Sequence, residues 1–188
     1  MNIEEYCSLD EKFLELRTRI FDVRASIYFL NEFIEQRNSS LYADYSLYLE
    51  AVFSRFHNYI INEIYCIFDI GEDAISIEKL KNEVISLHND KNIKKTIKNE
   101  YKSAYTKEIA EYVNVIRDFR NHGGVAHGNK RDYTRKISFK SVNLISIAIE
   151  KMYNILLKYY NDSYFNFDVK FEHKSLIDLA KDYENIKR

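Results

Sequence analysis

The sequence predicts an all-α protein, and three observations support that fold class. Proline is absent from all 188 residues, although an average usage of about 5% would supply about nine, so long helices can run without interruption. Apolar residues recur at spacings of three and four over long stretches, the pattern of helices with one buried face. Three of the four glycines fall within residues 117–128, so the rest of the chain contains few helix breakers.

Length and composition limit the possible architectures. A chain of 188 residues predicts a single domain, residues 1–188, with one sizeable hydrophobic core. Because 46% of the residues are hydrophobic and 30% are charged, the chain is expected to fold rather than stay disordered. The formal net charge of -1 excludes a global basic field, so any contact with RNA or DNA has to come from a local patch.

Other features of the sequence bear on location. The N-terminal residues lack the basic and apolar regions of a signal peptide, and no apolar run reaches the length of a membrane span. Cys7 and Cys66 are far apart and match no metal or redox spacing, which favours reduced, structural thiols. We therefore expect a soluble, cytoplasmic protein with no membrane partner and no cofactor.

The first predicted helix begins at the capping box Ser8-Leu9-Asp10-Glu11, in which a hydroxyl and a carboxylate three residues later satisfy free backbone amides. The helix is expected to end near residues 37–39. Its predicted buried face consists of seven apolar residues at three-to-four spacing. They are Phe13, Leu14, Ile20, Phe21, Ile27, Leu30 and Ile34.

A second helix is predicted from about Leu41 to Ile70, with Gly71 as its C-terminal cap. Its expected apolar stripe is Leu47, Val52, Phe56, Ile60, Ile64 and Ile67. A short third helix follows, capped by Ser76. Its apolar residues are Leu80, Val84 and Leu87.

Residues 89–104 are rich in lysine and asparagine and are expected to form a weakly packed helix. A lysine cluster within them is interpreted first as surface and second as an RNA-facing rim. It consists of Lys91, Lys94, Lys95 and Lys98. The next helix is predicted from about Tyr105 to Arg120. Its core-facing residues are Ile109, Tyr112, Val113, Ile116 and Phe119.

Ser138 opens the last long helix. Its buried face is predicted to be Val142, Ile145, Ile149, Met152, Leu156 and Tyr159. Residues 163–173 alternate aromatic and polar side chains without an evident partner strand, so an extended arm is expected, and residues 175–186 suit a short helix. Together these elements predict a bundle with a four-helix core, about residues 8–160, and a C-terminal extension, residues 161–188.

The one polar interruption of the helical pattern is residues 117–128, Arg-Asp-Phe-Arg-Asn-His-Gly-Gly-Val-Ala-His-Gly. Arg120 lies beside the buried stripe of its helix and needs an anionic partner or water, because burying an unpaired charge is costly. Gly123 and Gly124 let the chain turn tightly, so His127 can converge with Arg120 on one anion. Arginine offers a fixed fork for phosphate and histidine titrates near neutral pH. These two groups suffice for metal-free RNA cleavage by the 2′-hydroxyl of the RNA.

Through Arg120-Asn121 and Ala126-His127-Gly128, this stretch resembles the Arg-x(4–6)-His motif of the HEPN superfamily. The resemblance covers residues 8–160 as architecture and only the motif itself as sequence. It implies a HEPN-like helical bundle and a homodimer whose two motifs share a cleft. It further implies a metal-independent endoribonuclease of a phage-defence or toxin–antitoxin system that leaves a 2′,3′-cyclic phosphate. An antitoxin or a nucleotidyltransferase is the implied protein partner.

The resemblance also implies roles for single residues. His127 would be the general acid or base, Arg120 would stabilise the phosphorane, and Asn121 would help to orient the site. The motif has two registers, because Arg117 and His122 have the family's commonest spacing of four intervening residues, whereas Arg120 and His127 have six. The residues that flank Arg120 and His127 match the family better, so this register is preferred.

Other interpretations of the same residues stay open. The histidines are also explained as turn and cap residues, with the arginines complementing the C-terminal dipole of their helix. Asp118, His122 and His127 could supply three metal ligands, but their spacing fits no strong zinc signature. The alternative function is a non-catalytic helical module that binds a partner protein or nucleic acid.

A basic stretch, residues 128–136, follows the motif directly. It is expected to hold RNA through phosphate contacts and through stacking of its tyrosine on a base. The residues concerned are Lys130, Arg131, Tyr133, Arg135 and Lys136. A solvated loop is the other interpretation of this charge cluster.

Overall fold

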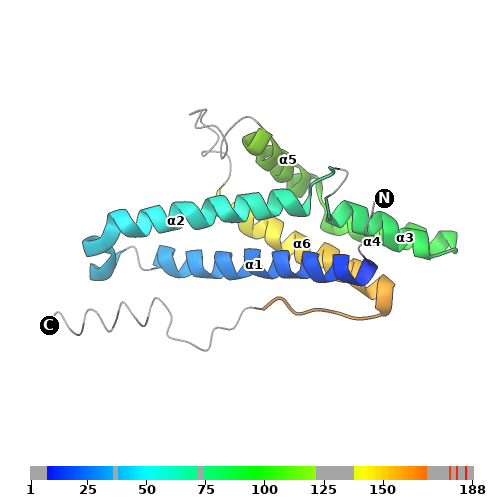
Figure 1. Ribbon diagram of the computed structural model, residues 1–188, viewed down its shortest axis with the longest axis horizontal. Coiled ribbons are helices and arrows are strands. Elements are labelled where there is room, and N and C mark those ends of the chain that lie inside the picture. Colours follow the sequence, from blue (N-terminus) through cyan, green and yellow to red (C-terminus); the bar gives the residue numbers. More distant parts are fainter. Residues whose placement is uncertain are drawn as a thin grey trace, which may run out of the picture.

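The computed structural model describes residues 8–35, 38–71, 74–121 and 138–168, together with the single positions 178, 181 and 185. This part of the chain is all-α, as predicted, and contains six helices. Their bounds are α1 Leu9–Glu35, α2 Ser40–Ile67, α3 Ile77–Leu87, α4 Lys91–Ala104, α5 Lys107–Asn121 and α6 Phe139–Asn161. Figure 1 shows α1 and α2 lying side by side, with α5 rising at an angle from the C-terminal end of α2.

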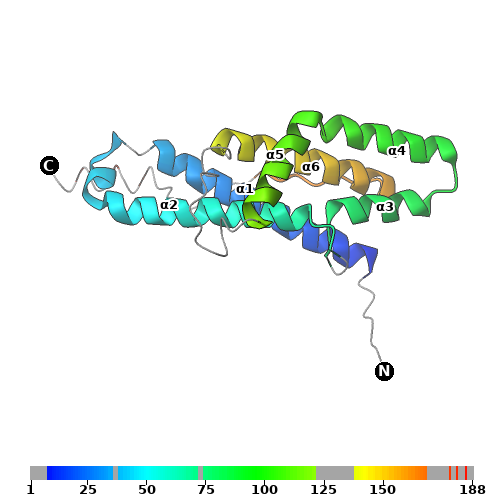
Figure 2. The same cartoon turned by 90° about the horizontal axis from the view of Figure 1, so that it is seen from above.

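Helix α6 is the central element, because it packs against all five other helices. Figure 2 shows its second half between α3 and α4. The helix begins as predicted, with the Ser138 hydroxyl accepting the Ser141 amide at 3.1 Å, and ends at Asp162, which has a left-handed φ of 55°. Of the six apolar residues predicted for its buried face, only Tyr159 is partly exposed.

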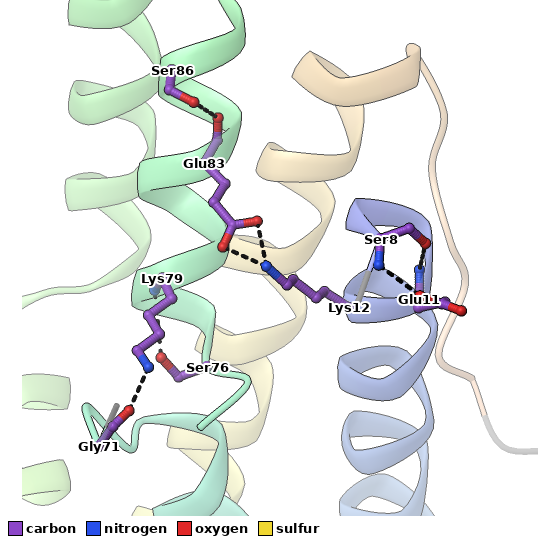
Figure 3. Close-up of polar contacts among 8 residues, drawn as sticks. All are labelled: Ser8, Glu11, Lys12, Gly71, Ser76, Lys79, Glu83 and Ser86. Atoms are coloured by element: carbon purple, nitrogen blue, oxygen red, sulfur yellow. Dashed lines mark hydrogen bonds and ion pairs between the residues drawn. The ribbon is translucent and has the colours of Figure 1, made fainter. Parts of the chain in front are cut away.

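The N-terminus of α1 confirms the predicted capping box. The Ser8 amide donates to Glu11 Oε2 at 2.6 Å, and the Glu11 amide donates to Ser8 Oγ at 3.3 Å (Figure 3). One residue further on, Lys12 donates to Glu83 of α3 at 2.8 Å. The start of α1 is therefore fixed both by its own cap and by an ion pair to a neighbouring helix.

The predicted buried face of α1 is wrong at three positions. Leu14, Phe21 and Ile34 are 51%, 41% and 37% exposed. Leu14 and Phe21 each follow a buried residue, and one residue step turns the side chain by about 100° around the axis, away from the neighbouring helices. Ile34 lies in the last turn of the helix. The apolar positions that take their place in the core are Leu16, Val23 and Phe33.

Helix α2 begins at Ser40, close to the predicted Leu41, but the first residue of its predicted apolar stripe and its predicted end are wrong. Leu47 is 90% exposed, because it lies two residues, about 200° around the helix axis, from Leu49, which is buried. Gly71 is not the C-terminal cap. The helix ends at Ile67, and the fully buried Phe68 takes the cap position. Burial of Phe68 turns the chain into the core before it reaches Gly71.

Helix α3 begins at the predicted cap, Ser76, which accepts the Lys79 amide (Figure 3). Its last residue, Leu87, was predicted to be buried but is 56% exposed. The prediction that α4 is weakly packed is also wrong. Ile97 and Tyr101 are buried, and the Tyr101 hydroxyl donates to Glu78 of α3 at 2.9 Å.

Residues 163–168 form an irregular segment that runs back beside α1 (Figure 1), which agrees with an arm rather than a paired strand. A side chain takes the place of a partner strand: Asn154 of α6 accepts the Phe165 amide at 2.8 Å and donates to its carbonyl at 3.0 Å. Phe167 is buried edge-on against Tyr153. The rest of the predicted arm, residues 169–173, and most of the helix predicted at 175–186 lie outside the described residues.

Candidate functional site

The described part of the candidate site is the last turn of α5, where it meets the end of α2. The Thr106 hydroxyl accepts the Ile109 amide at 3.3 Å and caps the start of α5. Four of its predicted core residues are buried, namely Ile109, Val113, Ile116 and Phe119, whereas Tyr112 is only partly buried. This apolar face fixes the rotation of α5 and so decides which way its two arginines point.

Arg117 is tied to the end of α2. Its Nη2 donates to the carbonyl of Phe68 at 2.8 Å, the residue that caps α2. The last carbonyls of a helix carry partial negative charge, so a guanidinium placed there is stabilising. Tyr105 stacks on Phe68 with ring centroids 5.5 Å apart. Burial raises the pKa of Tyr105, and the charge of Arg117 acts in the opposite direction. Arg117 thus joins α5 to the end of α2.

Arg120, one turn later, is exposed. Its Cζ lies 3.8 Å from the ring centroid of Tyr65, in the last turns of α2. A guanidinium over an aromatic face is attracted to the ring while its donors stay available to other partners. The helix end therefore presents one arginine used within the fold and one held on an aromatic ring at the surface.

This difference bears on the two registers of the motif. The arginine of the shorter register, Arg117, already has a partner inside the protein, whereas Arg120 makes no ion pair among the described residues. The expectation that Arg120 borders the buried stripe holds in a modified form, because the guanidinium lies on Tyr65 in contact with solvent. An arriving phosphate would find Arg120 accessible.

Most of the predicted site lies outside the described residues, and so does the side chain of Asn121. The predicted catalytic residues concerned are His122 and His127, and the predicted RNA-binding residues are Lys130, Arg131, Tyr133, Arg135 and Lys136. The structure therefore brings together only the arginines of the motif. In the lysine cluster of α4, Lys91, Lys95 and Lys98 are exposed and Lys94 is partly buried.

Two histidines outside the motif are held by contacts within the fold. His88 caps the end of α3, and its Nε2 lies 3.0 Å from the Tyr159 carbonyl. His57 stacks on Phe53 within α2, and burial lowers the pKa of His57. Across the described residues, no group of three or more His, Cys, Asp or Glu side chains could hold a metal ion. The proposed ligand set of Asp118, His122 and His127 is not tested by this, because both histidines lie beyond those residues.

Sequence reasoning missed Tyr65, Phe68 and Tyr105 as parts of this site. Tyr65 precedes Arg120 by 55 positions, and no local spacing connects them. Periodicity placed Tyr65 outside the apolar stripe of α2 but could not indicate which helix would approach it. The contact depends on how α5 lies on α2, which is set by burial over both helices.

The chain matches no protein-family model, no curated protein and no solved structure. Among the described helices, none combines the length and the apolar character that crossing a lipid bilayer requires. A function is therefore inferred from the residues of the site and from the resemblance of its motif.

Proposed function

We propose that the protein is a metal-independent endoribonuclease of the HEPN type, with a HEPN-like four-helix core, acting in phage defence or as a toxin. The observation that carries the proposal is the position of Arg120. It is an exposed cation held on Tyr65 at the end of α5, and the glycines and His127 of the motif follow it in the sequence. The all-α architecture, with a long central helix after the motif, is compatible with such a bundle.

In the proposed reaction the 2′-hydroxyl of one nucleotide attacks the adjacent phosphorus. Its proton passes to a general base, the P–O5′ bond breaks, and the 5′-oxygen leaves with a proton from a general acid. The products are a 2′,3′-cyclic phosphate and a 5′-hydroxyl. Arg120 would neutralise the charge that develops on the phosphorane oxygens, and His127 would move a proton. In the proposed homodimer the two motifs share one cleft.

The experiment is cleavage of a labelled single-stranded RNA by the purified protein, with and without EDTA. We expect cleavage that EDTA does not reduce and that Arg120→Met and His127→Ala abolish. Lys107→Met is the matched control, since Lys107 is an exposed cation at the other end of the same helix, and its activity should equal that of the wild type. Absence of cleavage by the wild-type protein in every buffer tested would reject the ribonuclease function and favour the alternative, a non-catalytic helical module.

The same assay separates the two registers. We expect Arg117→Met to lower stability through loss of the bond to Phe68, with cleavage retained at temperatures where the variant is folded. His122→Ala should likewise keep its activity. If His122→Ala abolishes cleavage while His127→Ala does not, the shorter register is the correct one.

A further inference from the structure

The outward face of α2 carries a stripe of side chains that leads toward Arg120 and is exposed over most of its length. The residues follow the three- and four-residue spacing of one helix face. The exposed residues are Tyr48, Ala51, Arg55, Asn58 and Tyr59, and the partly buried Asn62 and Tyr65 end the stripe. Tyr48 is 70% and Tyr59 40% exposed. Helix α5 meets α2 only toward the C-terminal end of α2 (Figure 1), so most of this face is uncovered by α5.

The stripe carries positive charge and no carboxylate of its own. Between Tyr48 and Tyr65 the only acidic residues of α2 are Glu50 and Glu63, and both lie to the sides of the stripe. Glu63 pairs with Arg19 of α1 at 3.0 Å, and Glu50 accepts a hydrogen bond from the Tyr42 hydroxyl. Arg55 is exposed and makes no ion pair among the described residues.

The neighbouring helix contributes one acid close to the stripe. Burial raises the pKa of Tyr59, and the charges of Glu63 and of Asp22 in α1 act in the same direction. Asp22 therefore lies at the edge of the stripe, next to α1, and Arg55 forms no ion pair with any side chain in the described part of the chain.

We propose that this face of α2 is a track for single-stranded RNA that ends at Arg120. The proposal rests on the proposed ribonuclease function, since it assigns the substrate and its direction of approach. Exposed aromatic rings stack unpaired bases, and arginine holds the phosphate backbone. A helix rises 1.5 Å per residue, so the stripe from Tyr48 to Tyr65 is about 26 Å long, enough for several extended nucleotides. Paired RNA does not offer its base faces, so the track should select single strands.

The test measures the affinity of a labelled single-stranded RNA of fifteen nucleotides by fluorescence anisotropy. Cleavage is prevented by working in an Arg120→Met background. We expect Arg55→Glu, and separately the double variant Tyr48→Ala with Tyr59→Ala, to weaken binding about tenfold or more. Lys107→Glu reverses an exposed charge away from the stripe, and its affinity should stay within about twofold of the background. Circular dichroism and urea unfolding verify that each variant is folded, and Arg55→Met provides a milder change at the same position.

The outcomes distinguish the track from the enzyme. If Arg55→Glu and the double tyrosine variant bind this RNA as tightly as the background, the track is wrong, even if the wild type cleaves RNA. If these variants lose affinity although the wild type cleaves no RNA, the RNA track is supported and the ribonuclease function is rejected. Equal affinity for a duplex of the same sequence would also overturn the proposal, because stacking requires unpaired bases. So would failure of the background protein to bind any single-stranded RNA, which would leave the face as a surface for another class of partner.

Discussion

The guanidinium of Arg120 lies over the ring of Tyr65, with Cζ 3.8 Å from the ring centroid. An exposed contact of this kind contributes about 0.5–1 kcal/mol, so the two residues should be coupled in stability. We predict that a double-mutant cycle with Tyr65→Leu and Arg120→Met gives a coupling of that size in urea unfolding. Tyr65→Phe keeps an aromatic face and should retain most of the coupling. Additive effects of Tyr65→Leu and Arg120→Met would contradict the contact.

Neighbouring leucines of α1 provide a test of the corrected core. Leu16 is fully buried, whereas Leu14 is 51% exposed. We predict that Leu16→Ala lowers the free energy of unfolding by about 2–5 kcal/mol, because it removes buried contacts and leaves a cavity. Leu14→Ala should cost less than about 1 kcal/mol. Both variants keep the high helix propensity of this position, so urea denaturation reports the difference in burial. Equal losses of unfolding free energy would contradict this assignment and favour the buried face of α1 that was predicted from the sequence.

The sequence predictions succeeded where a structural feature depends on residues close together in the chain. The caps at Ser8, Ser76 and Ser138 were predicted correctly, because each depends on a hydroxyl and an amide three residues apart. The end of α2 and the exposure of Leu14 depend on where other helices lie. Spacing along one helix leaves its rotation toward two neighbours undetermined, and α1 packs against both α2 and α6.

The same limit applies to the candidate site. Arg117 and Arg120 are one turn apart at the end of the same helix, and from the sequence only their flanking residues distinguish the two. The carbonyl of Phe68 and the ring of Tyr65 separate them. Tyr65 lies in the last turn of α2 and Phe68 caps that helix, so both partners lie about fifty residues earlier in the chain. Their proximity follows from helix packing and could not be read from the motif.

A partly buried ion pair joins α1 to α6. Arg24 Nε and Glu150 Oε1 are 2.6 Å apart, and the two side chains are 23% and 20% exposed. Burial raises the pKa of Glu150 more than the charge of Arg24 lowers it, so desolvation outweighs the attraction. We predict that Arg24→Met or Glu150→Met alone lowers stability by about 1–3 kcal/mol, because the remaining charge is left unpaired. The double variant should recover most of that loss in urea unfolding. A double variant as unstable as the sum of both singles would contradict this account.

Burial also makes His57 a source of pH-dependent stability. Its pKa in the folded protein lies below the ordinary value of about 6.5, so the unfolded chain binds the proton more tightly than the folded protein does. The stabilising contribution is therefore complete above about pH 6.5 and is lost as the pH falls through the folded pKa. Phenylalanine at this position keeps a ring against Phe53, whose centroid lies 6.4 Å from that of His57, and it cannot titrate. We predict that unfolding free energies measured from pH 7.5 down to pH 5 fall more steeply for the wild type than for His57→Phe. Carboxylates that titrate in the same range are common to both proteins and cancel in the comparison, so parallel curves would show that His57 is not desolvated in the fold.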